Sequence, residues 1–456
     1  MTSTVQLKQV LELSLGSPVG MLRAFPVHLD GEKAICAVYS ADFDIDPYTE
    51  MFFFPTDTLK LALFTTDGQI RWRRDLGPGV IPGIWFVPFY PFDLDQDGTD
   101  DIWFVHNLNE KHPLSVRESV LERIDGKTGQ TIDQYPWVYE EQQQPISQLF
   151  RNFIAGGYVN GRPVLVTAQG TYGSMYLQGW NADMTLRWKA EIPRDVPGAR
   201  GSHMCPVIDV NGDGVDEIFW GERCIELDRG TELFCADRDH YRGHSDVIQP
   251  IVHPGSGEIS IWTVRESDGQ VQPRVAMFDA EGNRAWGDVD TGHMDMGWSA
   301  RLHDDQSHIV MAIRIGQKTC GPDGRYHQDM DEFTYDALTG HPVPLPYSVY
   351  RTVPVDMNGD GYHELVRGIP GGDGEVFDRL GHSFGHVGGT VAMASKFMNL
   401  PGEQILCFYP DGTIRIWADE HAADSDAAKA RYAHPFYAAS QRLTGVGYNL
   451  CLMAGL

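Results

Sequence analysis

The sequence predicts an all-β protein, a β-propeller whose blades each carry one copy of a repeated hairpin. Two observations support this prediction. Short apolar segments alternate with Gly, Asp, Asn and Pro along most of the chain, and helix signals are scarce before the C-terminal part. A hairpin of the form apolar-x-Asp-x-x-Gly-x-apolar also recurs at a spacing typical of four-stranded propeller blades.

The hairpin motif occurs eight times. The copies are FTTDGQIRW (64–72), ERIDGKTGQTI (122–132), GWNADMTLRW (179–188), IELDRGTELF (225–234), MFDAEGNRAW (277–286), TYDALTGHPV (334–343), VFDRLGHSFG (376–385) and FYPDGTIRIW (408–417). They predict eight blades, with seven as the alternative if one hairpin is an addition to the ring. The turn is expected to close the outer hairpin of each blade, and the following Trp or Phe to pack between blades. No linker-like segment interrupts residues 1–456, so we expect one domain.

The C-terminal part of the chain differs from the repeats. Residues 417–443 are rich in Ala, with apolar groups at helical spacing, and predict one or two short helices that cap the ring closure. The last segment, GVGYNLCLMAGL (445–456), is expected to form a strand that completes a blade together with the N-terminal segment.

Composition excludes several classes of partner. The formal charge of -27 and the absence of a Lys/Arg run argue against nucleic acid. No apolar run is long enough for a transmembrane helix, and the N-terminus lacks the features of a secretory signal, so a cytoplasmic location is expected. The seven scattered cysteines, with no CxxC pair, indicate reduced and mostly buried thiols. An anionic substrate would need a local pocket of Arg and His.

Three Asp-rich loops follow the pattern of a hard-cation site. Oxygen side chains stand at positions 1, 3, 5 and 9, and Gly follows the third of them. The predicted ligands are Asp93, Asp95, Asp97 and Asp101 in loop 1, Asp209, Asn211, Asp213 and Glu217 in loop 2, and Asp356, Asn358, Asp360 and Glu364 in loop 3. Each loop lies between two apolar runs, which favours strand–loop–strand over an EF-hand. The sequence therefore predicts calcium, as a staple between strands in at least two of the loops.

Titratable side chains gather around loop 2 and at matching places in the repeats. His203 precedes loop 2, and the motif Gly-His-x-Asp recurs in register at His244 and His293. The candidate catalytic residues are His106, Tyr172, His203, Arg223 and His244, and the candidate substrate-binding residues are Arg200, Arg238, His240, His293 and Arg301. Each single His could instead be a structural hydrogen-bonding group, and Arg223 could form a buried ion pair with a carboxylate.

This set of residue types suits β-elimination at a uronic acid. The proton beside the carboxylate becomes acidic enough to remove when Arg or calcium neutralises the carboxylate, and a base and an acid complete the reaction. We expect Arg223, together with Arg238, to neutralise the carboxylate. His203 or His244 would be the base, with His106 or Tyr172 as the acid. Asp246 and Asp295 could equally be glycosidase carboxylates.

Three segments of the chain resemble the propeller-type rhamnogalacturonan lyases. They are SHMCPVIDVNGDGVDEIFWG (202–221), GHSDVIQPIVHPGSGEISIW (243–262) and RYAHPFYAASQRLTGVGYN (431–449). The resemblance covers residues 200 to 456 and implies an eight-bladed, calcium-loaded propeller that cleaves the rhamnose–galacturonate backbone of pectin. Ser202 and Ser245 depart from the family pattern, which has Asn and Gly there. Related propeller lyases use a His–Tyr–Arg set on rhamnose–glucuronate linkages of ulvan or gum arabic, and His106, Tyr172 and Arg223 could supply that set.

Three functional hypotheses follow. The first is a calcium-dependent lyase that cleaves a rhamnose–uronate linkage of an oligosaccharide or polysaccharide. The second is a glycoside hydrolase of the α-rhamnosidase type on the same propeller. The third is a non-catalytic calcium propeller that binds glycan or protein, since a fold does not fix a function.

Overall fold

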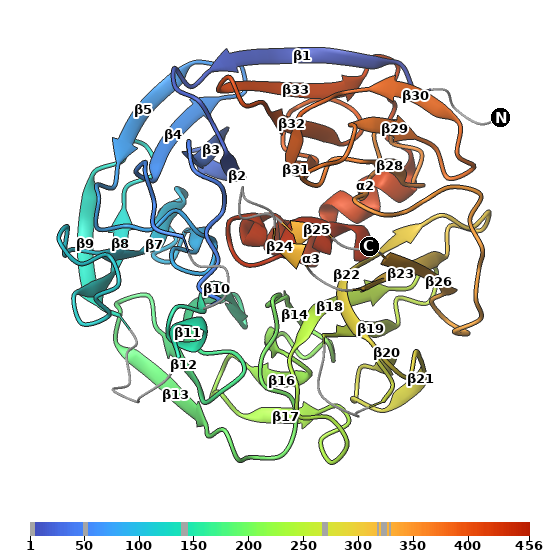
Figure 1. Cartoon of the computed structure of the whole chain (residues 1–456), viewed down its shortest axis with the longest axis horizontal. Coiled ribbons are helices and arrows are strands. Elements are labelled where there is room, and N and C mark those ends of the chain that lie inside the picture. Colours follow the sequence, from blue (N-terminus) through green and yellow to red (C-terminus); the bar gives the residue numbers. More distant parts are fainter. Residues whose placement is uncertain are drawn as a thin grey trace.

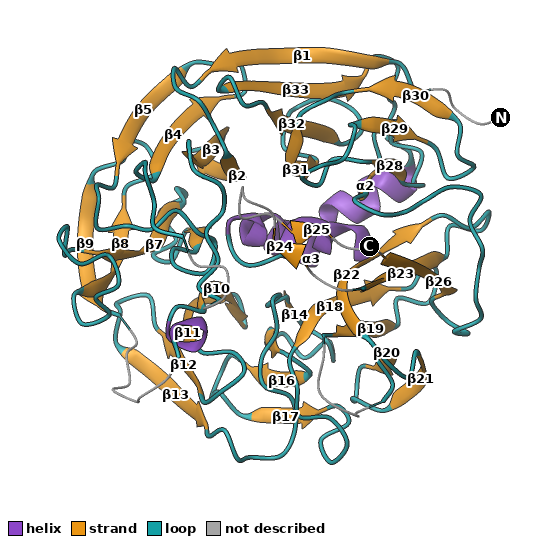
Figure 2. Ribbon diagram, viewed as in Figure 1, coloured by secondary structure: helices purple, strands orange, loops and turns teal. Residues whose placement is uncertain are grey.

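Eight β-sheets stand around a central axis and form the blades of a propeller (Figure 1). The computed structural model describes residues 5–48, 53–137, 145–266, 272–316, 319–320, 326–327 and 330–456. Strands and their connecting loops make up nearly all of the ring, and the longer helices lie at its centre (Figure 2). The prediction of an all-β, eight-bladed propeller with a short helical C-terminal part is confirmed.

The blades follow the order of the chain, and in each of them the first strand lies nearest the axis. Blade 1 contains β2 (Met21–Leu29), β3 (Glu32–Ser40), β4 (Lys60–Thr65) and β5 (Ile70–Asp75), and blade 2 contains β6 (Phe89–Phe92), β7 (Asp101–Asn107), β8 (Ser119–Ile124) and β9 (Thr131–Pro136). Blade 3 contains β10 (Asn152–Val159), β11 (Arg162–Gln169), β12 (Met175–Trp180) and β13 (Leu186–Ile192), and blade 4 contains β14 (Val207–Ile208), β15 (Glu217–Trp220), β16 (Arg223–Glu226) and β17 (Glu232–Cys235). Blade 5 contains β18 (Ser245–Val252), β19 (Ile259–Arg265), β20 (Val275–Asp279) and β21 (Arg284–Asp288), and blade 6 contains β22 (His293–Arg301), β23 (His308–Ile315) and β26 (Met330–Asp336). Blade 7 contains β27 (Val353–Val355), β28 (Glu364–Val366), β29 (Glu375–Phe377) and β30 (Ser383–His386), and blade 8 contains β31 (Thr390–Ser395), β32 (Gln404–Phe408), β33 (Thr413–Asp419) and β1 (Leu7–Ser14). A separate two-stranded sheet, β24 (Thr319–Cys320) with β25 (Tyr326–His327), and a single turn of helix, α1 (Ile146–Leu149), complete the elements outside the C-terminal part.

The N-terminal strand closes the ring. β1 pairs antiparallel with β33 and forms the outermost strand of blade 8. Two expectations about this closure are wrong. The C-terminal segment contributes a 3-10 helix rather than a strand, and the last hairpin copy (408–417) joins the second and third strands of its blade instead of the third and fourth. The reason is that the fourth strand of blade 8 comes from the other end of the chain.

Blade 6 is the exception to the four-stranded pattern. Its sheet contains β22, β23 and β26, and the predicted outer strand is reduced to an isolated bridge between Tyr335 and Pro342. Pro342 and the prolines that follow, Pro344 and Pro346, have no backbone N–H to donate to a strand ladder. The hairpin copy at 334–343 therefore makes the turn without a full fourth strand.

Packing between neighbouring blades explains why the hairpin motif recurs along the chain, and three blades show this contact. Trp72, Trp188 and Trp286 each donate an indole hydrogen bond to a backbone carbonyl in the turn of the next blade, at 3.0, 2.8 and 3.0 Å. The closing glycines of those turns, Gly129, Gly230 and Gly340, have φ near 70°, and a Cβ there would lie 2.5–2.7 Å from the indole. The expectation that the aromatic residue packs between blades is confirmed at these three positions.

Strand direction sorts the connections of the blades onto two faces. Because the strands of a blade are antiparallel, every turn from its first to its second strand lies on one face, and the entry to the first strand and the turn from second to third lie on the other. The face with the turns from first to second strands is named the loop face, since loops 1, 2 and 3 lie there. The opposite face, with the entries to first strands and the turns from second to third strands, is named the mouth face.

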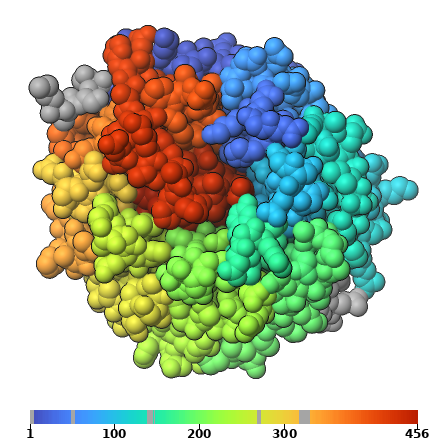
Figure 3. All heavy atoms as spheres, turned by 180° about the vertical axis from the view of Figure 1, so that it is seen from behind, coloured from blue at the N-terminus to red at the C-terminus, as the bar shows by residue number. Residues whose placement is uncertain are grey.

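The C-terminal part fills the centre of the ring. It consists of α2 (Asp426–Ala433), α3 (Pro435–Arg442), η1 (Leu443–Gly445) and η2 (Asn449–Gly455) (Figures 1 and 2). Seen from behind, the C-terminal residues, in red, occupy the middle of the molecule (Figure 3). The prediction of short helices is confirmed. They lie in the centre of the ring and do not cap its edge.

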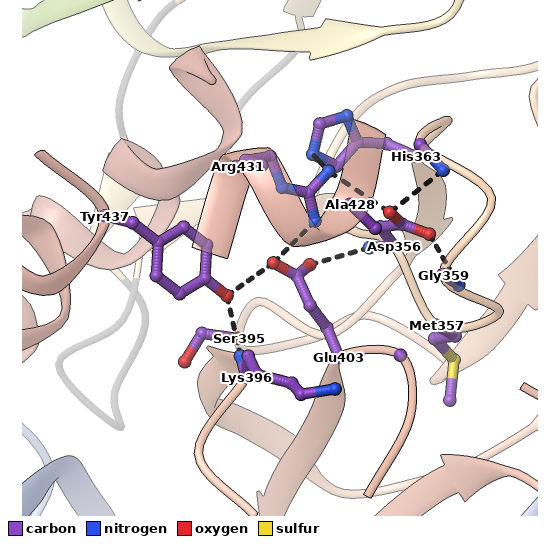
Figure 4. Close-up of polar contacts among 12 residues, drawn as sticks. Asp356, Met357, Gly359, His363, Ser395, Lys396, Glu403, Ala428, Arg431 and Tyr437 are labelled. Carbon is purple, nitrogen blue, oxygen red and sulfur yellow. Dashed lines mark hydrogen bonds and ion pairs between the residues drawn. The ribbon is translucent and has the colours of Figure 1, made fainter. Parts of the chain in front are cut away.

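A buried ion pair fixes α2 to two blades. Arg431, whose side chain is fully buried, lies 2.7 Å from a carboxylate oxygen of Glu403 and 3.3 Å from one of Asp356 (Figure 4). The Tyr437 hydroxyl of α3 donates to the same Glu403 carboxylate at 2.6 Å. The two helices are thus anchored to blades 7 and 8 through charge and hydrogen bonds as well as apolar packing.

No helix within the described ranges is long and apolar enough to cross a lipid bilayer. The cysteines that the structure describes with their side chains are all unpaired, and all but Cys451 are buried, as predicted for reduced thiols. Cys320 is placed only as part of a strand.

Replacing Arg431 with Met should destabilise the protein by roughly 3–5 kcal/mol, because it leaves two buried carboxylates without their cation. Chemical unfolding monitored by tryptophan fluorescence measures the change. Lys429→Met is the matched control, since Lys429 is exposed on the same helix, and its effect should stay below about 0.5 kcal/mol. Equal effects of the two substitutions would show that the Arg431 pair does not anchor the helix.

Candidate functional site

Titratable side chains from four neighbouring blades converge at the mouth face. Arg151 precedes β10, Tyr172 follows β11, His203 precedes β14, His244 precedes β18, and His293 begins β22. Asp246 lies in β18, and Glu266 follows β19. We name these seven residues the central cluster. Because entries to first strands and turns after second strands share the mouth face, the propeller brings together residues that are far apart in the sequence.

His203 stands in the middle of the central cluster. Its Nε2 atom lies 3.0 Å from the Tyr172 hydroxyl, and its Nδ1 atom lies 3.3 Å from a carboxylate oxygen of Asp246. Its ring centroid is 5.1 Å from that of His244. The backbone of His203 is also fixed, since its N–H donates to Ser245 and its carbonyl accepts from Tyr448. The imidazole is therefore held on both sides and is almost completely buried.

Glu266 connects two further histidines of the cluster. Its carboxylate contacts the His244 ring, and its other oxygen lies 2.9 Å from Nε2 of His293. Although burial alone would raise it, the pKa of Glu266 is held well below its usual range by His244, His293 and, more weakly, His203. Glu266 is consequently a carboxylate at neutral pH.

Four members of the cluster have the geometry of a cation site. His203, His244, Asp246 and Glu266 each offer one ligand atom, and these atoms lie within 4.8 Å of one another. Two imidazoles and two carboxylates form a mixed donor set for a divalent cation, because carboxylates suit calcium and manganese and imidazoles suit zinc and iron. The Asp246 carboxylate interacts with both histidines, since one of its oxygens lies 3.3 Å from Nδ1 of His203 and 3.8 Å from Nε2 of His244. The four residues can thus hold a metal ion that the sequence analysis had not placed here.

Tyr172 is held in a strained conformation between Arg151 and His203. Its φ is 76°, in the left-handed region that a bulky residue rarely adopts, and its N–H donates to the Arg200 carbonyl. The hydroxyl lies 3.3 Å from a guanidinium nitrogen of Arg151 as well as 3.0 Å from His203. Burial raises the pKa of Tyr172 well above its usual range, so the phenol stays protonated at neutral pH. The strain and the two contacts aim one hydroxyl group at the centre of the cluster.

Arg151 is a buried cation at the edge of the cluster. Its guanidinium lies 4.4 Å from the Trp85 ring centre and 3.1 Å from a carboxylate oxygen of Asp46. The side chain is 2% exposed, and its Nε and one terminal nitrogen form no hydrogen bond among the described residues. A substrate anion could therefore use donors of Arg151 that the protein itself leaves unused.

A second buried ion pair supports the strands that carry Asp246 and Glu266. Arg265 and Glu222 are paired by two contacts of 2.7 Å, and Ser245 donates to the same carboxylate at 3.2 Å. Both charged side chains are almost fully buried. Because Ser245 and Arg265 are the chain neighbours of Asp246 and Glu266, this pair fixes where the two carboxylates stand.

The open side of the cluster is lined by an aromatic ring and a histidine. Tyr448 is 43% exposed, and its ring packs edge-on against Trp85 and His203 with centroids 4.8 and 5.1 Å apart. His293 has 25% of its side chain exposed, more than the other two histidines of the cluster. A ligand would meet these two residues before the buried members.

The structure brings together part of the predicted site. Tyr172, His203, His244 and His293 lie in the central cluster, as their place in the repeats suggested. The backbone of Arg200 joins the cluster loops, since it accepts from Tyr172 and donates to Gly243.

The other predicted residues lie elsewhere. Arg223 is buried in β16, where it donates to the carbonyls of Pro197 and Ala199 and pairs with Glu232 at 2.5 Å; Arg238 pairs with the same Glu232. This arrangement places neither arginine against the cluster and matches the alternative of a buried ion pair. His106 of β7 is paired with Glu122 of β8 within blade 2, His240 lies in an exposed turn, and Arg301 lies on the loop face.

Sequence reasoning missed Arg151, Glu266 and Asp46 entirely, and it considered Asp246 only as a turn residue or glycosidase carboxylate. Asp246 had a signal, because it is the last residue of the motif Gly-His-x-Asp. Glu266 had a weaker one, as an acidic residue at the end of a strand of the same blade. Arg151 and Asp46 have no motif, and only the ring closure brings them to the cluster.

The three Asp-rich loops differ in how far the protein neutralises them. In loop 1, Arg123 contacts Asp95 and Asp101, the predicted ligands at positions 3 and 9. In loop 3, Arg431 pairs with Asp356. No Lys, Arg or His of the described chain pairs with the ligands of loop 2, and burial with nearby carboxylates raises the pKa of Glu217 to about 8. Loop 2 is therefore the loop whose predicted ligands have no basic side chain paired with them among the described residues.

The loops nevertheless share one backbone arrangement. In each, the first Asp accepts backbone N–H bonds from the glycine of its turn, as at Gly98, Gly214 and Gly361. Their ligand sets contain only oxygen atoms, which fits calcium. Asp93, Asp95 and Asp97 also have carboxylate atoms within 4.8 Å of one another.

Comparison with known proteins connects this geometry to one enzyme family. Residues 125–311 match the model of "Rhamnogalacturonan lyase family 11, C-terminal domain". Rhamnogalacturonan exolyase YesX of Bacillus subtilis (strain 168) is 25% identical over 342 residues, 63% of this chain and 56% of YesX. The endolyase YesW of the same organism is 23% identical over 267 residues, 51% of this chain and 42% of YesW. The chain spans about half the length of these curated relatives.

Solved structures give the same fold. A rhamnogalacturonan lyase PL11 of Bacillus licheniformis superposes with a TM-score of 0.75 at 20% identity, covering 97% of this chain and 81% of that one. The structure of rhamnogalacturonan lyase YesW gives a TM-score of 0.73 at 17% identity, covering 98% and 80%. The resemblance to propeller-type rhamnogalacturonan lyases that the sequence indicated is confirmed.

The contact between Glu122 and His106 leads to a prediction about how the stability of the protein depends on pH. Hydrogen bonds from His106 and Thr131 and the charge of Arg74 outweigh burial and lower the pKa of Glu122 from 4.5 to about 2. A lowered carboxylate pKa contributes stability that is present above about pH 4.5 and is lost as the pH falls towards 2. Glu122→Gln should therefore cost about 3 kcal/mol at pH 7 and less at pH 3.5, measured by urea unfolding at both values. An equal cost at both pH values would contradict this account.

Proposed function

We propose that this chain is a polysaccharide lyase that cleaves rhamnogalacturonan by β-elimination at the central cluster. The observation that carries the proposal is that all seven residues of the cluster fall within residues 125–311, the segment that matches the lyase family model. The proposed bond is the one between rhamnose and a galacturonate unit. Rhamnose–glucuronate linkages, as in ulvan or gum arabic, are a second substrate class to be tested, on oligosaccharides as well as polysaccharides.

The central cluster contains groups that can neutralise the carboxylate of a uronate substrate. β-Elimination begins with removal of the proton beside the uronate carboxylate, and the negative charge that develops must be stabilised. A divalent cation held by His203, His244, Asp246 and Glu266 would supply that stabilisation as a Lewis acid. The unused donors of Arg151 would bind the carboxylate from the other side. In this proposal Arg151 takes the part that sequence reasoning gave to Arg223.

The proton transfers are assigned from exposure and protonation state. Tyr172 stays protonated and reaches the cluster centre with its hydroxyl, so we assign it to protonate the leaving oxygen. His293 is the most exposed histidine of the cluster, so we assign it as the base. His203 and His244 are ligands of the proposed cation site, whereas His293 contacts only its Glu266 carboxylate, so the first two are less free to accept a proton from substrate.

Calcium at the three Asp-rich loops is proposed to stabilise the fold, whereas the cation at the central cluster is proposed to act on the substrate. These loops lie on the loop face, away from the central cluster, and each joins the inner two strands of a blade. Bound calcium would hold those strands together and neutralise loop carboxylates. Loop 2 is the site we expect to bind most tightly, because it contains no paired cation.

Tyr172→Phe should lower kcat/KM by roughly 10²–10⁴-fold, because it removes one hydroxyl and a general acid contributes about that much. The assay follows the ultraviolet absorbance of the unsaturated product from rhamnogalacturonan, with ulvan and gum-arabic oligosaccharides in parallel. His106→Gln is the control, since His106 lies outside the cluster, and it should keep wild-type kcat/KM.

Other outcomes of that assay would overturn the proposal. Release of free rhamnose without ultraviolet absorbance would indicate a hydrolase. Saturable glycan binding without any product would indicate a binding propeller. Wild-type turnover by Tyr172→Phe would leave the lyase in place but exclude its assigned acid.

Removing calcium should lower thermal stability, because a ligand that binds only the folded state stabilises it by about 2.7 kcal/mol at a hundredfold excess over Kd. Titration calorimetry and thermal unfolding with and without a chelator measure the binding and the stability. Asp213→Ala should remove one tight calcium from the binding stoichiometry. Asp183→Ala, which changes an exposed turn aspartate of blade 3, is the control and should bind calcium like the wild type. Equal calcium binding by both variants would exclude loop 2 as a calcium site.

A further inference from the structure

The loop face carries a second cluster of basic side chains, far from the groups used above. Arg301 is the last residue of β22 and His308 the first of β23, and the two are direct partners across the antiparallel ladder. His253 follows β18 in the neighbouring blade, and its ring centroid is 6.5 Å from that of His308. Because Arg301 and His308 flank a turn from first to second strand, these residues lie at the end of the blade opposite to His293.

Arg301 is a buried cation without an acidic partner. Its side chain forms no ion pair with any acidic residue that the structure describes, and its Nε has no hydrogen-bond acceptor. Burial, followed by the charge of Arg431, lowers the pKa of Arg301 to about 10, so it remains charged at neutral pH. Its backbone is held rigidly, since N–H and carbonyl both bond to His363. Only 9% of the residue is exposed.

The two histidines add unused nitrogen atoms beside this cation. Neither ring nitrogen of His308, which is 1% exposed, forms a hydrogen bond of standard geometry, although the Ala454 backbone interacts with the ring and acts to raise its pKa against the effect of burial. His253 uses Nε2 on Ser260 at 2.8 Å and leaves Nδ1 without a partner. Buried donors without acceptors cost free energy, and a bound ion or water commonly accounts for them.

The carboxylates nearby are already engaged. Asp356 and Glu403 are paired with Arg431, as Figure 4 shows, and the pKa of Arg431 is accordingly raised. Asp336 lies 3.2 Å from Nε2 of His303. Glu258 and Asp336 act on His253 only through longer-range charge. The charge of Asp356 acts on Arg301 at longer range, but no acidic side chain that the structure describes forms an ion pair with Arg301.

From this geometry we infer that Arg301, His308 and His253 form a binding site for a small oxyanion on the loop face. The guanidinium supplies the charge and a planar pair of donors, and the imidazoles supply further N–H groups. Sulfate, phosphate and the carboxylate of a sugar acid share the chemistry that this site recognises. The inference does not depend on the proposed lyase activity, and it gives Arg301 a ligand other than the substrate in the central cluster.

The test is titration calorimetry of the whole chain with sodium sulfate, against sodium chloride at equal ionic strength. Saturable sulfate binding to the wild type is expected. Arg301→Gln should weaken it roughly tenfold or more, because a charged hydrogen-bond partner is lost. Arg314→Gln is the matched control, since Arg314 lies in the same blade but is paired with Asp331, and it should bind sulfate like the wild type. Arg301→Lys keeps the charge and should weaken binding less than Arg301→Gln.

A parallel titration with galacturonate separates the two sources of the anion. Binding that depends on Arg301 and is seen with galacturonate but not sulfate would support the site and assign it to sugar acids. Binding of sulfate alone would support the site and assign it to inorganic oxyanions. Absence of saturable binding of either anion to the wild-type protein would overturn the inference without any variant. So would sulfate binding that Arg301→Gln leaves unchanged.

Discussion

The hydrogen-bond ladder between β1 and β33 is the interaction on which the rest of the structure depends. It joins residues from the two ends of the chain and turns a row of blades into a closed ring. Only in a closed ring do the entries of blades 3 to 6 face a common axis, and only then do Arg151, His203 and His293 approach one another. The same closure lets the C-terminal helices fill the centre, where Arg431 meets Asp356 and Glu403.

Two kinds of chemistry are separated by strand direction. The histidines and the tyrosine of the central cluster lie on the mouth face, at entries to first strands or after second strands, and the oxygen-rich loops lie on the loop face, where first strands turn into second strands. This separation lets an acidic protein keep a site suited to an anionic substrate, since the acidic loops stand a full strand length away. Tyr172 adds a local cost, a left-handed backbone in a bulky residue, which the packed cluster around it sustains.

The sequence allowed the fold to be predicted well and the site in part. The repeated hairpin has a fixed physical origin, a tryptophan placed over the glycine of the next turn, so its recurrence was visible as a pattern. His203, His244 and His293 were found because they occupy equivalent places in the repeats. Arg151 could not be found, because its role arises from contact with Trp85 and Asp46, which no local pattern encodes. Arg223 was misplaced because, although it begins β16 on the mouth face, its guanidinium is used by Glu232 and by the Pro197 and Ala199 carbonyls, which no local pattern reveals.

The C-terminal part links the two faces of the propeller. At one end Arg431 of α2 pairs with a carboxylate of loop 3, and further along the N–H of Tyr448 donates to the carbonyl of His203. The backbone N–H of Cys205 donates a further hydrogen bond to the side-chain oxygen of Asn449. The C-terminal segment therefore connects the loop face to the mouth face through the centre of the ring. The position of the His203 imidazole is set from the far side of the molecule, by a stretch of chain that takes no part in any blade.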